Sequence, residues 1–423
     1  MRGKSSLFFA LFVTVISIVF AVNPFHLANA AEPVVIGVPT SLGFLEGFES
    51  VNAMTLAIEE INAKGGVTVG GVQRPFKIEK IDLRDAAPGV PVPEALLGLE
   101  KIILEKKPHA IVVGPFRSEA LLAGMDIIAK HKVPMLGTIA MSPASETKVI
   151  EDREKYKYVF RVCLNAKHLI QYLAGTMALL KKEFEFDKVF VMHQDVAWAR
   201  ATAGLMKKVY FDKAGWTVVG QEAYPTGSGD YSSGLMKVRQ GGAQVILPIF
   251  DMPQSGILVR QWGQMQVPAI LAGFVSPLAG PEAWSMFYKK IDGAMNAIFE
   301  VGNVPTKQVP KSREFWRSYK KRWGREIQSG HGPAPSYDAV YVLAEAIERA
   351  GSLDADALVA ALEKTDRMGA IGRIRFDEGH QVTFGTDPNE AAIGAVIQWR
   401  KGKRVIVFPD SLAEKKVSLP AWM

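Results

Sequence analysis

The sequence predicts an α/β protein with two lobes, each built on a doubly wound parallel sheet. Short apolar segments alternate with amphipathic helical segments, in the β-α-β order that implies parallel strands joined by right-handed crossovers. The alternation restarts at Tyr156. About 390 residues follow the N-terminal segment, which is too many for one hydrophobic core. We therefore expect two lobes of the same plan.

The first 30 residues have the composition of a secretory signal peptide. Arg2 and Lys4 form a basic start, residues 7–22 are an apolar run, and residues 28–30 (Ala-Asn-Ala) are a small-residue cleavage site. A membrane anchor would need about 20 apolar residues, more than this run supplies. We expect cleavage after residue 30 and a mature protein outside the cytoplasm.

The first half of the chain supplies the elements of one sheet. A polar segment, 41–50, is expected to be a turn, and the glycines at 65 and 66 are expected to stop the helix before them. The expected strands are 34–39, 76–82, 111–113 and 133–136, and the expected helices are 51–63, a segment ending at 106, and the segment between the last two strands.

The second half repeats this order and then becomes less regular. Its expected strands are 158–164, 188–193, 216–223, 245–250 and 269–273, and its helices are 168–182, 200–214, 233–241 and 254–265. Beyond these we expect a strand at 294–301, helices at 312–323, 337–347 and 354–364, and a C-terminal β-hairpin that turns at 401–403.

The segment 111–142 contains two strand ends that should meet at one edge of the sheet. A polar tip follows each strand, and the helix between them begins near Ser118. In a doubly wound sheet this edge borders a ligand crevice, and a helix N-terminus there offers free N–H groups to an anion. Two ordinary βα loops would give the same pattern, so both interpretations remain open from these residues alone.

Several functional classes are excluded by composition and motifs. The net charge of +7 is scattered, without the basic, aromatic-interleaved stripe of a nucleic-acid-binding protein. Nucleotide-binding, zinc-protease and serine-hydrolase motifs are missing, and the histidines lack metal-ligand spacing. Residues 145–148 match S-x-x-K, but without the partner motifs of penicillin-recognising enzymes. The single cysteine, Cys163, is expected to be buried. We expect a protein that binds a ligand, with no cofactor, metal or nucleic acid.

Five segments resemble periplasmic solute-binding proteins of the leucine/isoleucine/valine-binding type, the receptors of ABC importers. They are IGVP (36–39), LAIEEINAKGGV (56–67), VVGPFRSEALLA (112–123), VPMLG (133–137) and GRIRFDEG (372–379). The resemblance implies the type I periplasmic-binding-protein fold, with a cleft that closes by hinge bending. It also implies a monomer in the periplasm whose partners are a small carboxylated solute and an ABC permease in the inner membrane.

The resemblance further implies three crossovers between the lobes, near 162–165, 275–277 and 376–379. Lobe 1 would comprise residues 31–162 and 277–376, and lobe 2 residues 163–276 and 377–423. The ligand-binding positions that it implies are Ser118, Ala140, Met141, Ser142, Asn165, Trp198, Asp251 and Phe274. Arg117 is a further candidate, because a cation beside Ser118 suits a carboxylate.

Among these positions, Ser118 and the tip 140–142 match the part of the family site that holds the ligand carboxylate. Trp198 matches an aromatic residue that covers the ligand. At two positions where amino acid binders have acids, this chain has Asn165 and Phe274, which leaves Asp251 as the single acid expected near an amino group. Because an unpaired ammonium in a closed cleft would be costly, the sequence favours a ligand without one.

We therefore expect a receptor for a small carboxylated solute, either a neutral amino acid or an aromatic or other organic acid, and not an enzyme. Arg117 suits a carboxylate, although a solvent-facing loop residue would look the same. A sensing subunit for a membrane receptor would use the same fold and closure, and an enzyme on this fold is a more distant alternative.

Overall fold

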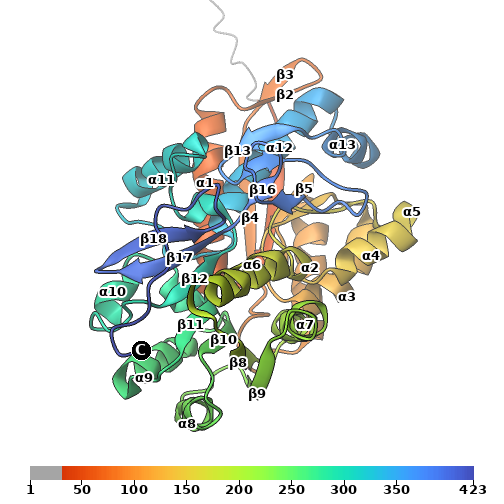
Figure 1. Ribbon diagram of the computed structural model, residues 1–423. Helices are drawn as coiled ribbons and strands as arrows, with labels where there is room; N and C mark the ends of the chain where they lie inside the picture. The colour runs from red at the N-terminus through yellow and green to blue at the C-terminus, as the bar shows by residue number, and fades with distance from the viewer. Residues whose placement is uncertain (1–30) are drawn as a thin grey trace, which may run out of the picture.

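The computed structural model describes residues 31–423 and places them in two α/β lobes (Figure 1). The sheet of lobe 1 has five strands, and every pair of neighbouring strands in it runs parallel. In spatial order these strands are β4 (Phe76–Asp82), β1 (Val34–Thr40), β5 (Ala110–Val113), β6 (Met135–Gly137) and β7 (Val159–Arg161).

The sheet of lobe 2 has seven strands and ends in the C-terminal hairpin (Figure 1). Its central strands are buried on both faces, which explains their continuous apolar sequences. In spatial order the strands are β18 (Lys403–Phe408), β17 (Ala395–Arg400), β12 (Met295–Ile298), β11 (Ile270–Val275), β10 (Val245–Phe250), β8 (Lys188–Gln194) and β9 (Thr217–Tyr224).

Helices flank both sheets. Those of lobe 1 are α1 (Leu45–Asn62), α2 (Val92–Lys106), α3 (Ser118–His131), α4 (Ala144–Glu151), α5 (Arg153–Tyr156), α11 (Pro310–Trp323), α12 (Pro333–Ala350) and α13 (Ala355–Leu362). Those of lobe 2 are α6 (Ala166–Phe184), α7 (Ala197–Leu205) with a π-helical turn η1 (Met206–Phe211), α8 (Ser232–Gln240), α9 (Gly256–Met265) and α10 (Ala283–Met286).

Two small sheets that contain antiparallel strand pairs lie outside the two main sheets. The sequence pattern did not predict either of these small sheets. One is the hairpin of β2 (Val67–Val69) and β3 (Val72–Arg74). The other contains, in spatial order, β13 (Arg367–Gly369), β14 (Gly372–Ile374), β16 (Ala392–Ile393) and β15 (Phe384–Gly385).

Strand pairing corrects two of the predicted lobe boundaries. Strand β12 was assigned to lobe 1, but it pairs with β11 and β17 in the sheet of lobe 2. Residues 377–393 were assigned to lobe 2, but β15 and β16 join β14, and Gln381 bridges to Arg161 of lobe 1. An apolar strand does not reveal from its sequence which sheet will bury it. We propose crossovers near residues 162–165, 299 and 394.

The first helix begins earlier than the sequence pattern predicts. Residues 41–50 were expected to form a polar turn, yet α1 starts at Leu45. Its first two turns bury Glu46 and Glu49, which are 1% and 0% exposed. These carboxylates lie on one face of the helix because they are three residues apart. The helix start therefore places acidic side chains inside the molecule rather than in solvent.

Gly66 allows a close approach of two backbone segments after α1. Its φ is +89°, and a Cβ atom there would lie 2.1 Å from the backbone oxygen of Arg74. Gly66→Ala is therefore expected to lower the free energy of unfolding by roughly 1–3 kcal/mol, as measured by chemical denaturation. Gly43→Ala is the matched control, because a Cβ there meets no atom within 4 Å. An equal, small effect of both substitutions would contradict this account.

The predicted signal peptide, residues 1–30, lies outside the described residues. Between residues 31 and 423, none of the helices combines the length and the apolar character needed to cross a bilayer. Cys163 is fully buried, as predicted, and burial raises the pKa of its thiol to about 12.

Candidate functional site

An enclosed cavity lies between the two lobes. Its free volume is about 20 Å³, which is room for little more than one water molecule, so a solute of amino acid size requires the lobes to separate. Residues of both lobes line it, and most are aromatic or acidic: Glu46, Phe116, Ser118, Ile139, Met141, Trp198, Asp251, Phe274, Phe299 and His331.

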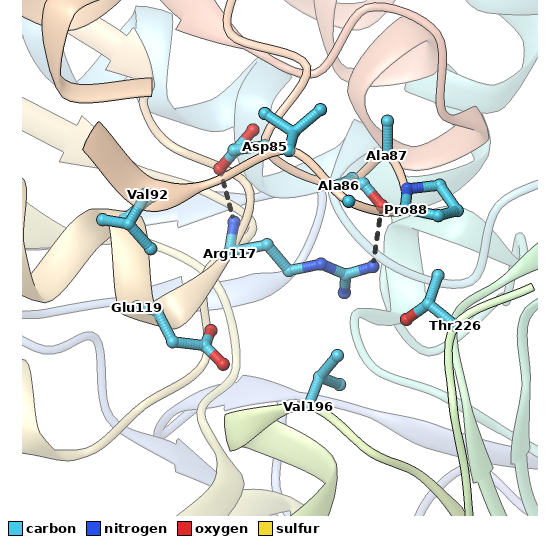
Figure 2. A pocket seen from close by; sticks show the side chains of 12 residues that line it. Asp85, Ala86, Ala87, Pro88, Val92, Arg117, Glu119, Val196 and Thr226 are labelled. Atoms are coloured by element: carbon cyan, nitrogen blue, oxygen red, sulfur yellow. Dashed lines mark hydrogen bonds between the residues drawn. The ribbon is translucent and has the colours of Figure 1, made fainter. Parts of the chain in front are cut away.

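A second, wider cavity lies beside the first. Its free volume is about 210 Å³, and it is lined by residues 85–90, Val92, residues 117, 119 and 120, Val196 and Thr226. Figure 2 shows the Arg117 side chain extending through this cavity toward Ala86. Consecutive residues at the start of α3 line different cavities. Residues 116 and 118 line the enclosed cavity, and Arg117 and Glu119 line the wider one.

Ser118 and the tip after β6 form the polar wall that lobe 1 contributes. The Ser118 hydroxyl oxygen accepts hydrogen bonds from the backbone amides of Met141 (3.3 Å) and Ser142 (3.1 Å). Both lone pairs of that oxygen are thereby engaged, which leaves its O–H free to donate. Because Ser118 also begins α3 and lines the cavity, this wall offers donors to an anionic group.

The wall from lobe 2 is aromatic. Trp198, at the start of α7, packs edge-on to Phe274 of β11 with ring centroids 6.0 Å apart. Phe299, just after β12, packs 4.2 Å from Phe274. Trp198 and Phe274 were predicted at this wall from the sequence. Phe299 was not, because it follows a strand that we had assigned to lobe 1.

Arg117 and Asp251 form an ion pair across the cleft. The two side chains are 8% exposed, and Nη1 lies 2.5 Å from Oδ2 of Asp251. The same oxygen accepts a hydrogen bond from Nε1 of Trp198 at 2.7 Å. Burial alone would lower the pKa of Arg117, but the attraction of Asp251 outweighs burial and raises it. Arg117 therefore joins the lobes and does not line the enclosed cavity, so it is neither the carboxylate ligand of that cavity nor the solvent-facing residue that the sequence left open.

Asn165 lies outside both cavities, contrary to the predicted site. It is fully buried and caps α6, because its Oδ1 accepts a hydrogen bond from the His168 amide at 2.9 Å. Its amide nitrogen donates to Glu146. We had interpreted asparagine at this position as the loss of an acid that binds an amino group. Its role as a helix cap explains the residue type instead, because helix starts prefer asparagine. Ala140 and Ser142 also line neither cavity, and Ser142 takes part only through the amide that it donates to Ser118.

Glu46 is an acid of the cleft that the sequence pattern did not indicate. Its Oε1 accepts a hydrogen bond from the Ser276 hydroxyl, and it lines the enclosed cavity with Asp251. Burial, together with the nearby Asp251 carboxylate, raises the pKa of Glu46 to about 7. Asp251 is therefore not the single acid of the cleft, which removes one premise of the expectation that the ligand lacks an amino group. Glu46 could have been predicted in the cleft only if the start of α1 had been placed at Leu45.

His331 connects the cavity to the crossovers. Its Nε2 donates to the Ile139 carbonyl oxygen at 2.7 Å, and its Nδ1 lies 3.0 Å from Glu300 Oε1. Both ring nitrogens face acceptors, which favours an imidazolium. Burial alone would lower the pKa of His331, but Glu300 and the Ile139 carbonyl outweigh it and raise it. Glu300 also accepts from the Leu164 amide at 3.1 Å, so it ties the first crossover to the second.

Within residues 31–423, no group of three or more His, Cys, Asp or Glu side chains is placed to hold a metal ion. The geometry thus consists of a hydrogen-bond-donating wall, an aromatic wall and buried acids between two lobes. Two α/β lobes that meet at such a cavity define a class of proteins that bind small solutes between their lobes.

A family model described as periplasmic binding protein matches residues 40–397. The chain therefore belongs to the periplasmic binding protein family. It is 26% identical over 387 residues to Leu/Ile/Val-binding protein homolog 7 of Brucella suis biovar 1, with 89% of this chain and 90% of that protein covered.

Two solved structures show the same fold. One is the branched-chain amino acid transporter substrate-binding protein LivJ of Streptococcus pneumoniae in complex with isoleucine (TM-score 0.73, 20% identical, covering 89% of this chain and 100% of that chain). The other is an ABC transporter solute-binding protein of R. palustris in complex with benzoate (TM-score 0.70, 15% identical, covering 90% and 99%). The fold class predicted from the sequence, the type I periplasmic-binding-protein fold, is confirmed.

Proposed function

We propose that the protein is an extracytoplasmic receptor of an ABC importer that binds a small carboxylated solute between its lobes. The observation that carries this proposal is the Ser118 hydroxyl, held by the amides of Met141 and Ser142 and opening onto an aromatic-lined cavity. A carboxylate would accept from the Ser118 O–H while that oxygen stays bound to the two amides. The apolar body would then lie among Trp198, Phe274 and Phe299.

The relatives support the same reading. Two structures of the same fold are complexes with isoleucine and with benzoate, and each of these ligands has a carboxylate and an apolar body. We propose that the partner is an ABC permease in the inner membrane and that the mature chain acts as a monomer in the periplasm. We also propose that the protein is not an enzyme, so a bound solute should be recovered chemically unchanged.

A thermal-shift screen of the mature chain, residues 31–423, tests this function. The common L-amino acids, benzoate and other aromatic acids are the probes. A solute present at 100 times its Kd stabilises the folded protein by about 2.7 kcal/mol, which is readily detected as a rise in Tm. A screen in which no carboxylated solute raises Tm would contradict the proposal.

Ser118→Ala tests the carboxylate contact once a binding solute is known. Removing the hydroxyl deletes one hydrogen bond to the solute and leaves the Met141 and Ser142 amides without their acceptor, so the Kd measured by calorimetry should rise roughly tenfold or more. Ser285→Ala, at an exposed serine of α10, is the matched control and should leave Kd unchanged. Equal Kd values for the wild type and Ser118→Ala would place the carboxylate elsewhere.

An uptake measurement distinguishes a role in import from a role in sensing. If the protein serves an importer, deleting its gene should abolish high-affinity uptake of the labelled solute in the source cells. Unchanged uptake, with loss of a transcriptional or behavioural response to the same solute, would favour a sensing subunit.

A further inference from the structure

Glu46 has an unusual position for a carboxylate. It lies in the first turn of α1, is 1% exposed and faces the enclosed cavity. Ser276 donates to Oε1, whereas Oε2 has no hydrogen-bond partner in the part of the chain that the structure describes. A buried carboxylate oxygen without a donor is costly, so its presence in a binding cavity points to a donor that arrives with the ligand.

A second free oxygen lines the same cavity. Asp251 Oδ2 receives the donors of Arg117 and Trp198, but Oδ1 has no partner among residues 31–423. Both acids line the cavity, and the Asp251 charge acts on Glu46 strongly enough to affect its protonation. Opposite lobes therefore each contribute one free carboxylate oxygen to the lining of this cavity.

Glu46 has no ion-pair partner of its own among the described residues, although the His331 and Asp251 charges both act on it. Asp251 is matched by Arg117, and His331 is matched by Glu300. No basic side chain lies within 4 Å of Glu46 in the described structure, and its neighbours in the cavity are otherwise apolar or hydroxylic. An anionic solute alone would add a second negative charge to this enclosed space, whereas a solute that also carries a positive charge would neutralise the first.

We propose that Glu46 is the specificity-determining residue of the cleft, and that it selects a carboxylated solute that also bears a protonated nitrogen. That nitrogen donates to the free oxygens of Glu46 and Asp251, while the carboxylate is held at Ser118. The inference rests on the proposed receptor function and adds the charge class of the solute. It replaces the expectation from the sequence that the solute lacks an amino group.

Proton exchange on binding follows from this placement. The raised pKa of Glu46, about 7, means that the group is partly protonated at neutral pH. A solute nitrogen that donates to Glu46 favours its ionised form, so binding should release protons at neutral pH. A solute with a carboxylate but no amino group would favour the protonated form and take up a proton instead. The sign of the exchange thus reports which charge lies beside Glu46.

Matched solutes allow a direct calorimetric test. L-leucine is compared with 4-methylpentanoate, and L-phenylalanine with 3-phenylpropanoate, because each pair differs only in the amino group. Each titration is run in two buffers of different ionisation enthalpy, which gives the number of protons exchanged. The proteins are the mature wild type, Glu46→Gln and Glu49→Gln.

Glu49→Gln is the matched control. Glu49 lies on the same face of α1, and burial raises its pKa to about 7 as well. Its carboxylate does not line the cavity and instead accepts from the backbone amides of Gln328 (3.0 Å) and Ser329 (2.8 Å). Its substitution should change stability but not the preference between paired solutes.

The expected result is that the amino acid of a pair binds the wild type at least tenfold more tightly than its partner and releases protons. Glu46→Gln should reduce that preference roughly tenfold and remove the proton release, and Glu49→Gln should do neither.

Equal or tighter binding of the acid without an amino group, or proton uptake by the wild type with the amino acid, would overturn the inference and leave the receptor function standing. Proton exchange by the wild type decides the matter even if Glu46→Gln does not fold. If no carboxylated solute of either kind binds, the receptor function itself fails, and the inference fails with it.

Discussion

Replacing Glu300 with leucine is expected to lower the free energy of unfolding by about 3–5 kcal/mol, because it breaks a buried ion pair and leaves several donors without an acceptor. Glu300 is fully buried and accepts from His331, from the amides of Leu164 and Gly332, and from the Asn303 side chain. These contacts hold the second crossover against the first, so their loss affects both lobes.

Chemical denaturation of the mature chain measures this effect. Glu300→Gln keeps an acceptor for the Leu164 amide but loses the charge that pairs with His331, so its effect should be smaller. Glu390→Gln, at an exposed glutamate, is the matched control and should be indistinguishable from the wild type. A loss of less than about 1 kcal/mol for Glu300→Leu would show that this pair contributes little to the fold.

Replacing Arg117 with methionine should open the cleft of the free protein. The substitution removes the partner of Asp251, and breaking a buried pair in this way costs about 3–5 kcal/mol in the state that buries it. Only the closed arrangement buries the pair, since separated lobes expose Asp251 to water. A cost of this size changes the ratio of closed to open molecules by at least about a hundredfold.

Small-angle X-ray scattering of the free protein checks this prediction through the radius of gyration. Arg117→Met should have a larger radius than the wild type, and the double substitution Arg117→Met/Asp251→Leu should recover part of the difference by removing the unpaired acid. Arg153→Met is the control, because Arg153 pairs with Glu363 at the surface. Identical scattering of Arg117→Met and the wild type would show that the pair does not hold the lobes together.

The sequence predicted the parts of this molecule that depend on local pattern. Alternating strands and helices indicate the parallel sheets, and the strand ends at 114 and 138 indicate the edge where Ser118 and Met141 meet. Trp198, Asp251 and Phe274 were placed by resemblance to a family, and the structure brings all three to the same cavity.

The misses depend on long-range contacts. Strand β12 is a short apolar segment, and only its pairing with β11 and β17 assigns it to lobe 2. Asn165 stands at a position where relatives have an acid, but its side chain caps a helix. Glu46 was hidden because acidic residues in a polar segment are usually exposed, and burial of its helix turn could not be deduced from local composition.

The most direct test of the proposed site is a crystal structure of the mature protein with the tightest-binding solute from the thermal-shift screen. The expected structure has the solute carboxylate within hydrogen-bond distance of the Ser118 hydroxyl and its apolar body against Trp198 and Phe274. A solute bound instead in the wider cavity, with its carboxylate on Arg117, would contradict the site described for this protein.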